Sequence, residues 1–393
     1  MARNITVGID IGTYQVKVVI SELLKDSDKR STRIIGTGLS ESKGLRHGYI
    51  INGPEVTASI KTAVGLAEKA SGIKVHRAFI GVGGIGLQGV TATSSAMINK
   101  TDLETTELDI EKVAEICERE LPVTLIQNRR ILHSIPLFYK IDGKTVWAKT
   151  PLGMKGTKLE VKMLFVTCLE QHINDLLEAV DTAGIDVEDV IASPIAASFV
   201  TLSKTQKIAG CVLANIGAET ISIVVFENNI PISMEIFPIG STDITNDIAL
   251  GLKIPLEEAE NIKLGALGSN SYSKKKLDEI INARLTDMFE LIENHLKKIG
   301  RNELLPAGIF ITGGGGAIGN IEDLAKVSLR LPSRIAELNL GEQKNKIKDS
   351  TWAVAYGLCV LGFSDNEKET LGPRKTFNKW WDKIFKWVKK FLP

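Results

Sequence analysis

The sequence repeats one strand–turn–strand pattern at a constant offset of 205 residues. Residues 7–13 (Val-Gly-Ile-Asp-Ile-Gly-Thr) match residues 212–218 (Val-Leu-Ala-Asn-Ile-Gly-Ala), and the match continues from residues 16–19 to residues 221–224. Each copy places a polar residue and an Ile-Gly turn between two apolar strand segments, a pattern that is typical of a β-hairpin. This repeat limits the possible folds more than any other feature, because it predicts two related halves within one α/β chain.

Each repeated turn has the composition of a phosphate-binding site. Gly12 and Gly217 let the backbone approach an anion closely, and the N–H groups of such turns form a concave anion site. Asp10 and Asn215 end the preceding strands and would point toward Mg²⁺, which keeps several waters and needs few carboxylates. For Lys17 and Thr220, phosphate contact and an ordinary strand or surface role are both open. The remaining candidates in and beside the two turns are Thr13, Tyr14, Lys17, Ala218, Glu219 and Thr220.

A third glycine-rich turn follows an apolar strand predicted at residues 307–312. A strand that enters such a turn leaves room for a purine or a ribose, although a connector without a ligand is the alternative. Two matches to the dinucleotide pattern G-x-G-x-x-G, at Gly81 and Gly314, lack the required strand–turn–helix context or domain layout. The chain contains no G-x-x-x-x-G-K-[ST] loop, so it is not a P-loop enzyme. The candidate ligand residues in this turn are Gly313, Gly314, Gly315 and Gly316.

Bulk composition excludes several classes of protein. The 393 residues are 44% apolar and 24% charged, which suits a chain with a large core. The formal net charge of +1 argues against nucleic-acid binding. The four cysteines lack metal-ligand spacing and are expected to be reduced core residues. The five histidines are scattered along the chain, which argues against a metal site. The sequence shows neither a signal peptide nor an apolar run long enough to span a bilayer, so we expect a cytoplasmic chain.

The last 17 residues, 377–393, predict an amphipathic helix that lies flat on a membrane. Apolar side chains recur at helical spacing on one face, and lysines occupy most other positions; residues 374–393 carry seven positive charges against one negative. Each lysine near an anionic surface contributes about 1 kcal/mol. The alternative is a helix that packs on the core or on a partner protein. The membrane-binding candidates are Phe377, Lys379, Trp380, Trp381, Lys383, Ile384, Phe385, Lys386, Trp387, Val388, Lys389, Lys390, Phe391 and Leu392.

Two phosphate turns and a late strand–glycine turn resemble the signature of the actin-like ATPase superfamily. Within it, nearly the whole chain is similar to the FtsA family of bacterial cell-division proteins. The segments that carry this resemblance are 8–13, 133–136 (His-Ser-Ile-Pro), 150–156 (Thr-Pro-Leu-Gly-Met-Lys-Gly), 237–240 (Phe-Pro-Ile-Gly), 243–248 (Asp-Ile-Thr-Asn-Asp-Ile), 255–260 (Pro-Leu-Glu-Glu-Ala-Glu) and the basic tail.

The resemblance implies an actin-like, ribonuclease H-like duplicated fold, with two lobes around a nucleotide cleft and an inserted subdomain 1C. The implied divisions are 1–84 with 164–202 as subdomain 1A, 85–163 as 1C, 203–245 with 304–350 as 2A, 246–303 as 2B, 351–363 as a helix that returns to 1A, 364–376 as a linker, and 377–393 as the membrane-targeting helix.

The resemblance also implies ATP with Mg²⁺ in the cleft and head-to-tail filaments at the cytoplasmic face of the inner membrane, at the division site. It implies that the C-terminal peptide of the tubulin-like protein FtsZ binds subdomain 2B, and that later division proteins bind 1C. Lys297, Lys298 and Arg301 are candidates for the peptide contact, although an exposed helix C-terminus also favours basic residues.

This chain departs from the superfamily pattern in ways that predict weak ATP hydrolysis. Asn215 stands where the second motif has Asp, and Ser193 stands where the related chaperones have an acidic residue. Hydrolysis needs a group that positions or activates water. Glu260 and Lys263 match a chaperone pair that holds adenosine, but a solvated helical ion pair is an equal alternative.

Two other functions remain as alternatives. A pilus-assembly scaffold similar to PilM would share the fold but would normally lack the basic tail. A small-molecule kinase of the same superfamily would need an acid that accepts a hydroxyl proton, and the sequence offers no candidate.

Overall fold

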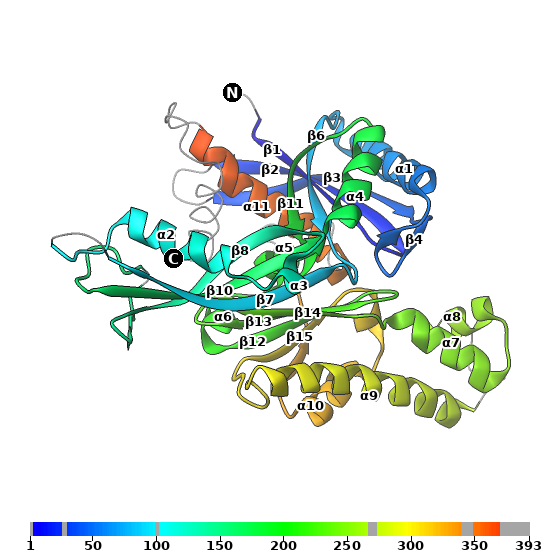
Figure 1. Ribbon diagram of the computed structural model, residues 1–393. Coiled ribbons are helices and arrows are strands. Elements are labelled where there is room, and N and C mark those ends of the chain that lie inside the picture. The colour runs from blue at the N-terminus through cyan, green and yellow to red at the C-terminus, as the bar shows by residue number, and fades with distance from the viewer. Residues whose placement is uncertain are drawn as a thin grey trace.

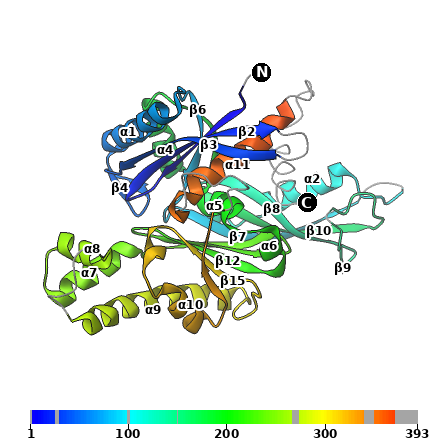
Figure 2. The ribbon, with the colours of Figure 1, turned by 180° about the vertical axis from the view of Figure 1, so that it is seen from behind.

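The computed structural model describes residues 3–25, 30–98, 102–148, 150–265, 273–338 and 349–369. It shows two lobes and an insert that projects to one side of the boundary between them (Figures 1 and 2). Lobe I contains a five-stranded sheet of order β11-β6-β1-β2-β3, and lobe II contains one of order β14-β13-β12-β15-β16. The strands of lobe I are β1 (Ile5–Ile11), β2 (Gln15–Lys25), β3 (Arg30–Glu41), β6 (Arg77–Val82) and β11 (Asp186–Ala192).

The two sheets share one topology, which confirms the predicted duplication. In each sheet the first strand pairs antiparallel with the second and parallel with a later strand, β6 in lobe I and β15 in lobe II. The registers keep the sequence offset: Asp10 pairs with Lys17, and Asn215 pairs with Ser222. The strands of lobe II are β12 (Cys211–Ile216), β13 (Ile221–Glu227), β14 (Ile230–Phe237), β15 (Gly308–Thr312) and β16 (Ser333–Ile335).

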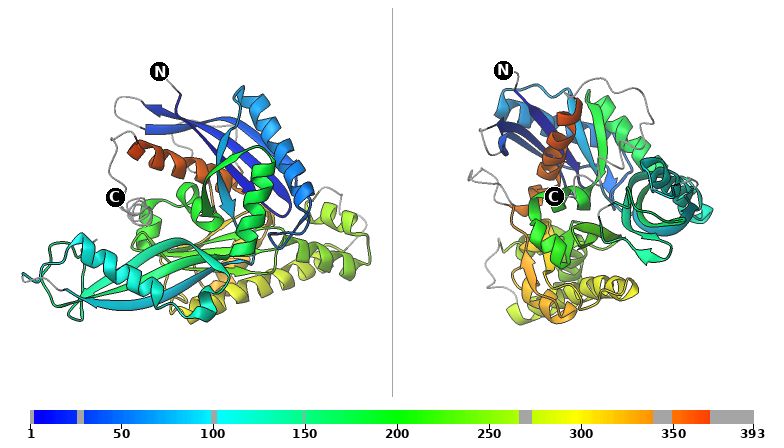
Figure 3. Two further views of the ribbon diagram at one scale, coloured as in Figure 1. Left: turned by 45° about the horizontal axis from the view of Figure 1, so that its top comes forward. Right: turned by 90° about the vertical axis from the view of Figure 1, so that its left-hand side faces the viewer.

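Helices cover both faces of the lobe I sheet (Figure 3). Helices α1 (Gly53–Ser71) and α4 (Glu170–Thr182) pack together on one face, and α5 (Ser193–Thr201) and α11 (Ala353–Glu369) pack together against the other. Helix α11 packs against β1 and α5 of lobe I. It continues into the segment expected to be a linker, because residues 364–369 contain no glycine or proline and the Gly372-Pro373 pair comes later.

Lobe II carries a helical arm beyond its sheet. Helices α7 (Ser241–Leu252) and α8 (Leu256–Lys263) contact each other, and the long α9 (Lys274–Lys298) packs on α7 and on α10 (Ile321–Leu329). Phe289 and Ile292 of α9 are fully buried in the lobe II core. A separate hydrophobic cluster joins lobe I to lobe II side chains such as Phe226 and Phe310, so the lobes share part of their core.

The insert is a small α/β unit with a core of its own. Its sheet has the order β7-β10-β8-β9 and is covered by α2 (Glu107–Arg119). The expected boundary between residues 163 and 164 falls inside β10, so the insert extends to the end of that strand. Its other elements are β7 (Leu87–Met97), α3 (Val123–Ile126), β8 (Arg129–Ile141), β9 (Lys144–Thr145) and β10 (Lys158–Leu169).

The insert also contacts lobe II. Strand β7 runs beside β14, and the two backbones approach so closely that a Cβ at Gly89 would lie 2.8 Å from the carbonyl oxygen of Met234. The insert is therefore attached to lobe I through the chain and to lobe II through packing.

In the part of the chain that the structure describes, no helix is long and apolar enough to cross a membrane.

Replacing the buried Phe165 of β10 with alanine should destabilise the insert selectively. Phe165 is fully buried in the insert's own cluster, and such a truncation costs about 3–5 kcal/mol. We expect faster hydrogen exchange across residues 87–167 and little change in α9. Phe138→Ala, at a side chain that is 38% exposed, is the control and should have a small effect. Equal loss of protection in all three units would contradict a separate insert core.

Candidate functional site

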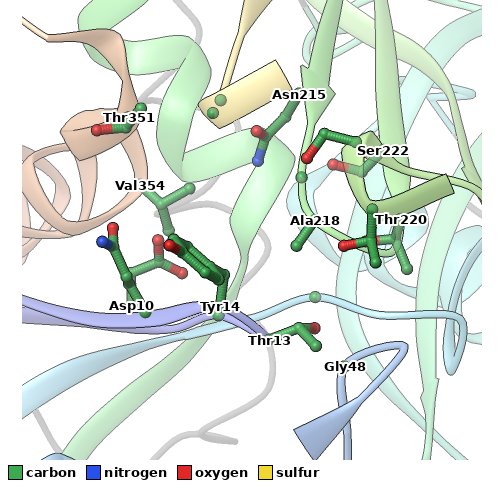
Figure 4. Close-up of a pocket in the computed structure, with 18 of the residues that line it drawn as sticks. Asp10, Thr13, Tyr14, Gly48, Asn215, Ala218, Thr220, Ser222, Thr351 and Val354 are labelled. Atoms are coloured by element: carbon green, nitrogen blue, oxygen red, sulfur yellow. The ribbon is translucent and has the colours of Figure 1, made fainter. Parts of the chain in front are cut away.

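The two repeated turns have the same backbone geometry. In the first turn (residues 12–15) the Gly12 N–H donates to the Gln15 carbonyl oxygen at 3.1 Å, and in the second turn (residues 217–220) the Gly217 N–H donates to the Thr220 carbonyl oxygen at 2.8 Å. Figure 4 shows side chains from both hairpins around one space between the lobes. The duplicated hairpins therefore form two walls of a single site.

That space is a cavity of ≈ 580 Å³, within the roughly 300–1,000 Å³ typical of small-molecule sites. Its lining contains most of the residues that the sequence predicts. The predicted residues in the lining are Asp10, Gly12, Thr13, Tyr14, Lys17, Asn215, Gly217, Ala218, Thr220, Glu260, Lys263, Gly313 and Gly314.

Three predicted residues lie outside the lining. Glu219 contacts His47 of lobe I through its side chain and its backbone oxygen. Gly315 and Gly316 are buried, and a Cβ at Gly315 would overlap the side chain of Ile216. The glycine turn therefore offers only its first half to a ligand, because the short 3₁₀ helix η2 (Gly314–Ala317) carries the rest toward the core.

Asp10 and Lys17 face each other across the first hairpin. Burial raises the pKa of the Asp10 carboxyl to about 6, although the positive charge of Lys17 acts in the opposite direction. Burial also lowers the pKa of the Lys17 amine, which the carboxylates of Asp10 and Asp349 partly offset. A partly buried carboxylate that borders the cavity is suited to receive a cation, since Mg²⁺ binds proteins through few carboxylates.

All three N–H donors of the Lys263 ammonium, in the lining beside α7, have protein oxygens as partners. Its ammonium contacts the Ser241 carbonyl oxygen at 3.1 Å, the Thr245 hydroxyl at 2.8 Å and the Glu260 carboxylate at 2.7 Å. An ammonium has three N–H donors, so Lys263 has none left for a ligand. Glu260 also accepts from Thr245 but remains one-third exposed. In this geometry Lys263 orients Glu260, which has free lone pairs for ligand hydroxyls.

Several lining residues carry no repeat or glycine pattern in the sequence. They include Ser241 and Thr242 at the start of α7, His172 of α4, and Thr351 of the 3₁₀ helix η3 (Ser350–Trp352). The Asp349 side chain accepts from the Thr351 N–H at 2.9 Å, and an Asp followed by a helix is a recognisable N-terminal signal. That signal could have identified η3 from sequence. His172 could not be found, because only the fold brings α4 to the cleft.

Ser193 and Asn215, the two departures from the superfamily pattern, both line the cavity. Among the described residues, no group of three or more histidine, cysteine, aspartate or glutamate side chains could hold a metal ion by itself. Cation binding at this site would therefore depend on Asp10 together with ligand oxygens and water.

The basic cluster lies where α9 meets the lobe II sheet. Arg301 forms an ion pair with Glu227 of β13 at 2.8 Å, and Lys297 pairs with Glu293 at 2.8 Å. Lys298 is exposed. The predicted membrane helix, 377–393, lies outside the described residues.

Gly313→Ala should destabilise the end of β12 that leads into the turn at residues 217–220. Gly313 has a φ of +88°, and a Cβ there would overlap the Asn215 Oδ1 and the Ile216 carbonyl oxygen. We expect a loss of at least about 2 kcal/mol in urea unfolding. Gly319→Ala is the matched control, because a Cβ at Gly319 meets nothing within 4 Å. Equal stability of the two variants would show that the turn is not constrained.

Asp10→Asn should stabilise the ligand-free protein at pH 7. Since the Asp10 pKa rises from 3.8 to about 6 on folding, the folded state binds more protons, and stability falls as pH increases through this window. That shift already includes the opposing charge of Lys17, so removing the carboxylate should recover about 1–2 kcal/mol at pH 7 and little at pH 4. Thermal unfolding from pH 4 to 7.5 tests this, with the exposed Asp181→Asn as control. A less stable variant at pH 7 would refute it.

Comparison with known proteins agrees with the geometry. A family model described as cell division protein FtsA matches residues 212–357, and a model of the SHS2 domain inserted in FtsA matches residues 87–167. The chain is 32% identical over 363 residues to cell division protein FtsA of Bacillus subtilis, covering 86% of this chain and 79% of that protein. It is 30% identical over 358 residues to cell division protein FtsA of Borreliella burgdorferi, covering 85% of each.

Solved structures share the fold at lower identity. The PilM-PilN type IV pilus biogenesis complex gives a TM-score of 0.63 at 16% identity, covering 91% of this chain and 98% of that one. MreB5 of Spiroplasma citri bound to ADP gives 0.53 at 11% identity, covering 94% and 99%. The matched sequence, the actin-like pair of lobes and the SHS2 insert together place this chain in the cell division protein FtsA family.

Proposed function

We propose that this cell-division protein binds ATP with Mg²⁺ between its lobes, assembles into filaments and links FtsZ to the inner face of the membrane. The observation that carries the proposal is the pair of equivalent turns that face one cavity. Two anion-binding backbones on opposite walls suit a polyphosphate better than a single phosphate, because each turn can hold a different part of the chain.

The donor set of the cavity fits a nucleotide. Gly12 and Gly217 present the turns, Asp10 and Asn215 reach the space between them, and Glu260 lies at the far end with capacity for ribose hydroxyls. When bound, Mg²⁺ would neutralise phosphate charge beside Asp10, whose carboxylate carries a pKa that desolvation raises to about 6. The fold relative MreB5 is described as bound to ADP, which supports a nucleotide in the corresponding cleft.

Hydrolysis is expected to be slow. Asn215 and Ser193 line the cavity at the two positions where the superfamily pattern has acidic residues. A carboxylate at either position could orient the attacking water or hold a metal-bound water. An amide and a hydroxyl can hydrogen-bond water but cannot accept its proton near neutral pH. The protein would therefore use bound ATP mainly as a structural ligand.

Membrane attachment is assigned to residues 377–393. The alternation of aromatic and lysine residues gives this segment an apolar face and a strongly basic face, which favours an anionic bilayer surface. Peripheral attachment through the tail would place the lobes at the cytoplasmic side, at the division site.

The FtsZ C-terminal peptide is assigned to the end of α9. The ion pairs of Lys297 and Arg301 hold the cluster in place, and Lys298 is exposed beside them. The insert offers a second surface for later division proteins, since Trp147 near its tip is 94% exposed. Similarity to the PilM fold keeps a pilus scaffold as the alternative, but the relatives that match in sequence are cell-division proteins.

Liposome flotation tests the proposal directly. The full chain and a 1–375 truncation are mixed with anionic vesicles, with and without Mg²⁺–ATP, and with a labelled FtsZ C-terminal peptide. We expect only the full chain to float, to float more with ATP through polymer avidity, and to carry the peptide with it. Lys298→Glu should reduce peptide capture without reducing flotation.

Each part of the proposal can fail separately. Equal flotation of the full chain and the truncation would remove the tail as an anchor. Absence of any effect of ATP, together with no nucleotide binding by calorimetry, would remove the ligand. Flotation of neutral vesicles at the same level would show that lysine charge is not used.

A further inference from the structure

A turn of lobe I crosses the cleft and holds the second phosphate turn. This turn joins β4 (Leu45–Arg46) to β5 (Tyr49–Ile50). The His47 N–H donates to the Glu219 carboxylate, and the His47 Nδ1 lies 3.1 Å from the Glu219 carbonyl oxygen. One residue of lobe I therefore contacts one residue of lobe II through both its backbone and its side chain.

Lobe I holds His47 rigidly in an unusual conformation. The residue has a φ of +48°, which L-residues rarely adopt, and the Ile85 N–H donates to its carbonyl oxygen at 3.2 Å. The adjacent Gly48 packs against Gly84 so closely that a Cβ on either would overlap the other backbone. Gly84, in a glycine-rich segment that does not form a dinucleotide motif, is therefore the residue on which the His47 turn packs.

Lobe II holds the other partner from the opposite side. The Ser241 N–H donates to the Gly217 carbonyl oxygen at 2.9 Å, and the Thr242 N–H donates to the Ala218 carbonyl oxygen at 2.8 Å. Both donors belong to the first turn of α7, the start of the helical arm. The second phosphate turn is therefore fixed between α7 on one side and His47 on the other.

We propose that His47 and Glu219 form an interlobe latch that positions the second phosphate turn and keeps the cleft closed around its ligand. Gly48 on one side and Ala218 and Thr220 on the other line the cavity next to the latch (Figure 4). A phosphate ligand that touches both sides binds the latched state better than an open state, and it therefore shifts the protein toward the latched state. Glu219 is in this view a positioning residue and not a ligand contact.

The same geometry links the ligand to the helical arm. If the latch opens, the second turn loses its support from lobe I and can move only with α7. The ligand-dependent part of the latch rests on the proposed nucleotide binding, whereas its effect on lobe closure does not.

The first test measures the distance between the lobes without any ligand. Spin labels at Lys61→Cys in α1 and Val327→Cys in α10 report this distance, because both positions are exposed and the four native cysteines are buried. We expect Glu219→Ala to lengthen and broaden the distance distribution by double electron–electron resonance. Glu219→Gln keeps an acceptor for the His47 N–H and should retain most of the narrow distribution.

The second test measures the release of a fluorescent ATP analogue by stopped flow. Glu219→Ala should accelerate release about tenfold, as expected for the loss of one charge-assisted hydrogen bond, while Glu219→Gln stays within about threefold. His47→Asn tolerates positive φ and keeps a side-chain donor, so it should retain more of the wild-type rate than His47→Gly. The double variant Glu219→Ala/His47→Gly should be no faster than the faster single variant.

The outcomes separate the latch from the proposed function. Identical distance distributions for the wild type, Glu219→Ala and His47→Gly would overturn the latch, whether or not a nucleotide binds. If no variant and no wild-type protein binds the analogue, the proposed function fails, and the ligand-free distances still decide the latch. His47→Gly supplies the same test if Glu219→Ala fails to fold, which thermal unfolding would reveal.

Discussion

The backbone hydrogen bond that closes each phosphate turn is the constraint on which the cleft depends. It runs from Gly12 to Gln15 in lobe I and from Gly217 to Thr220 in lobe II. Each bond fixes the end of an antiparallel hairpin. The first strand of each hairpin, β1 or β12, also pairs in parallel with a later strand, β6 or β15. A small change in either turn would shift both the ligand wall and the register of the sheet behind it.

The lobes are joined at several independent places. They share part of a hydrophobic core, the insert packs against β14, and His47 contacts Glu219 at the mouth of the cleft. Apolar packing is non-directional and tolerates small rotations, whereas hydrogen bonds weaken steeply with geometry. The polar contact between His47 and Glu219 is therefore more sensitive to a rotation of the lobes, while the core keeps the two lobes together.

Much of the fold could be predicted from the sequence because its signals are local and repeated. The helix at residues 53–71 begins after the Asn52 side-chain cap and ends at Gly72, whose φ is positive, and both are local signals. The site was also largely predictable, since turn glycines and strand-end polar residues lie on the hairpins that build it. The role of Glu219 was not, because its partner is 172 residues away in the chain.

The sequence by itself determined the duplicated hairpins, the glycine turn and the basic amphipathic tail, because each depends on the order of neighbouring residues. Only the tertiary structure decided which residues of each turn line the cavity. It directed Gly315 and Gly316 into the core, occupied all three donors of Lys263 with protein oxygens, and seated the His47 turn on Gly84. These outcomes depend on how the lobes pack. Packing brings together residues that are far apart in the chain, so no local sequence pattern predicts their contacts.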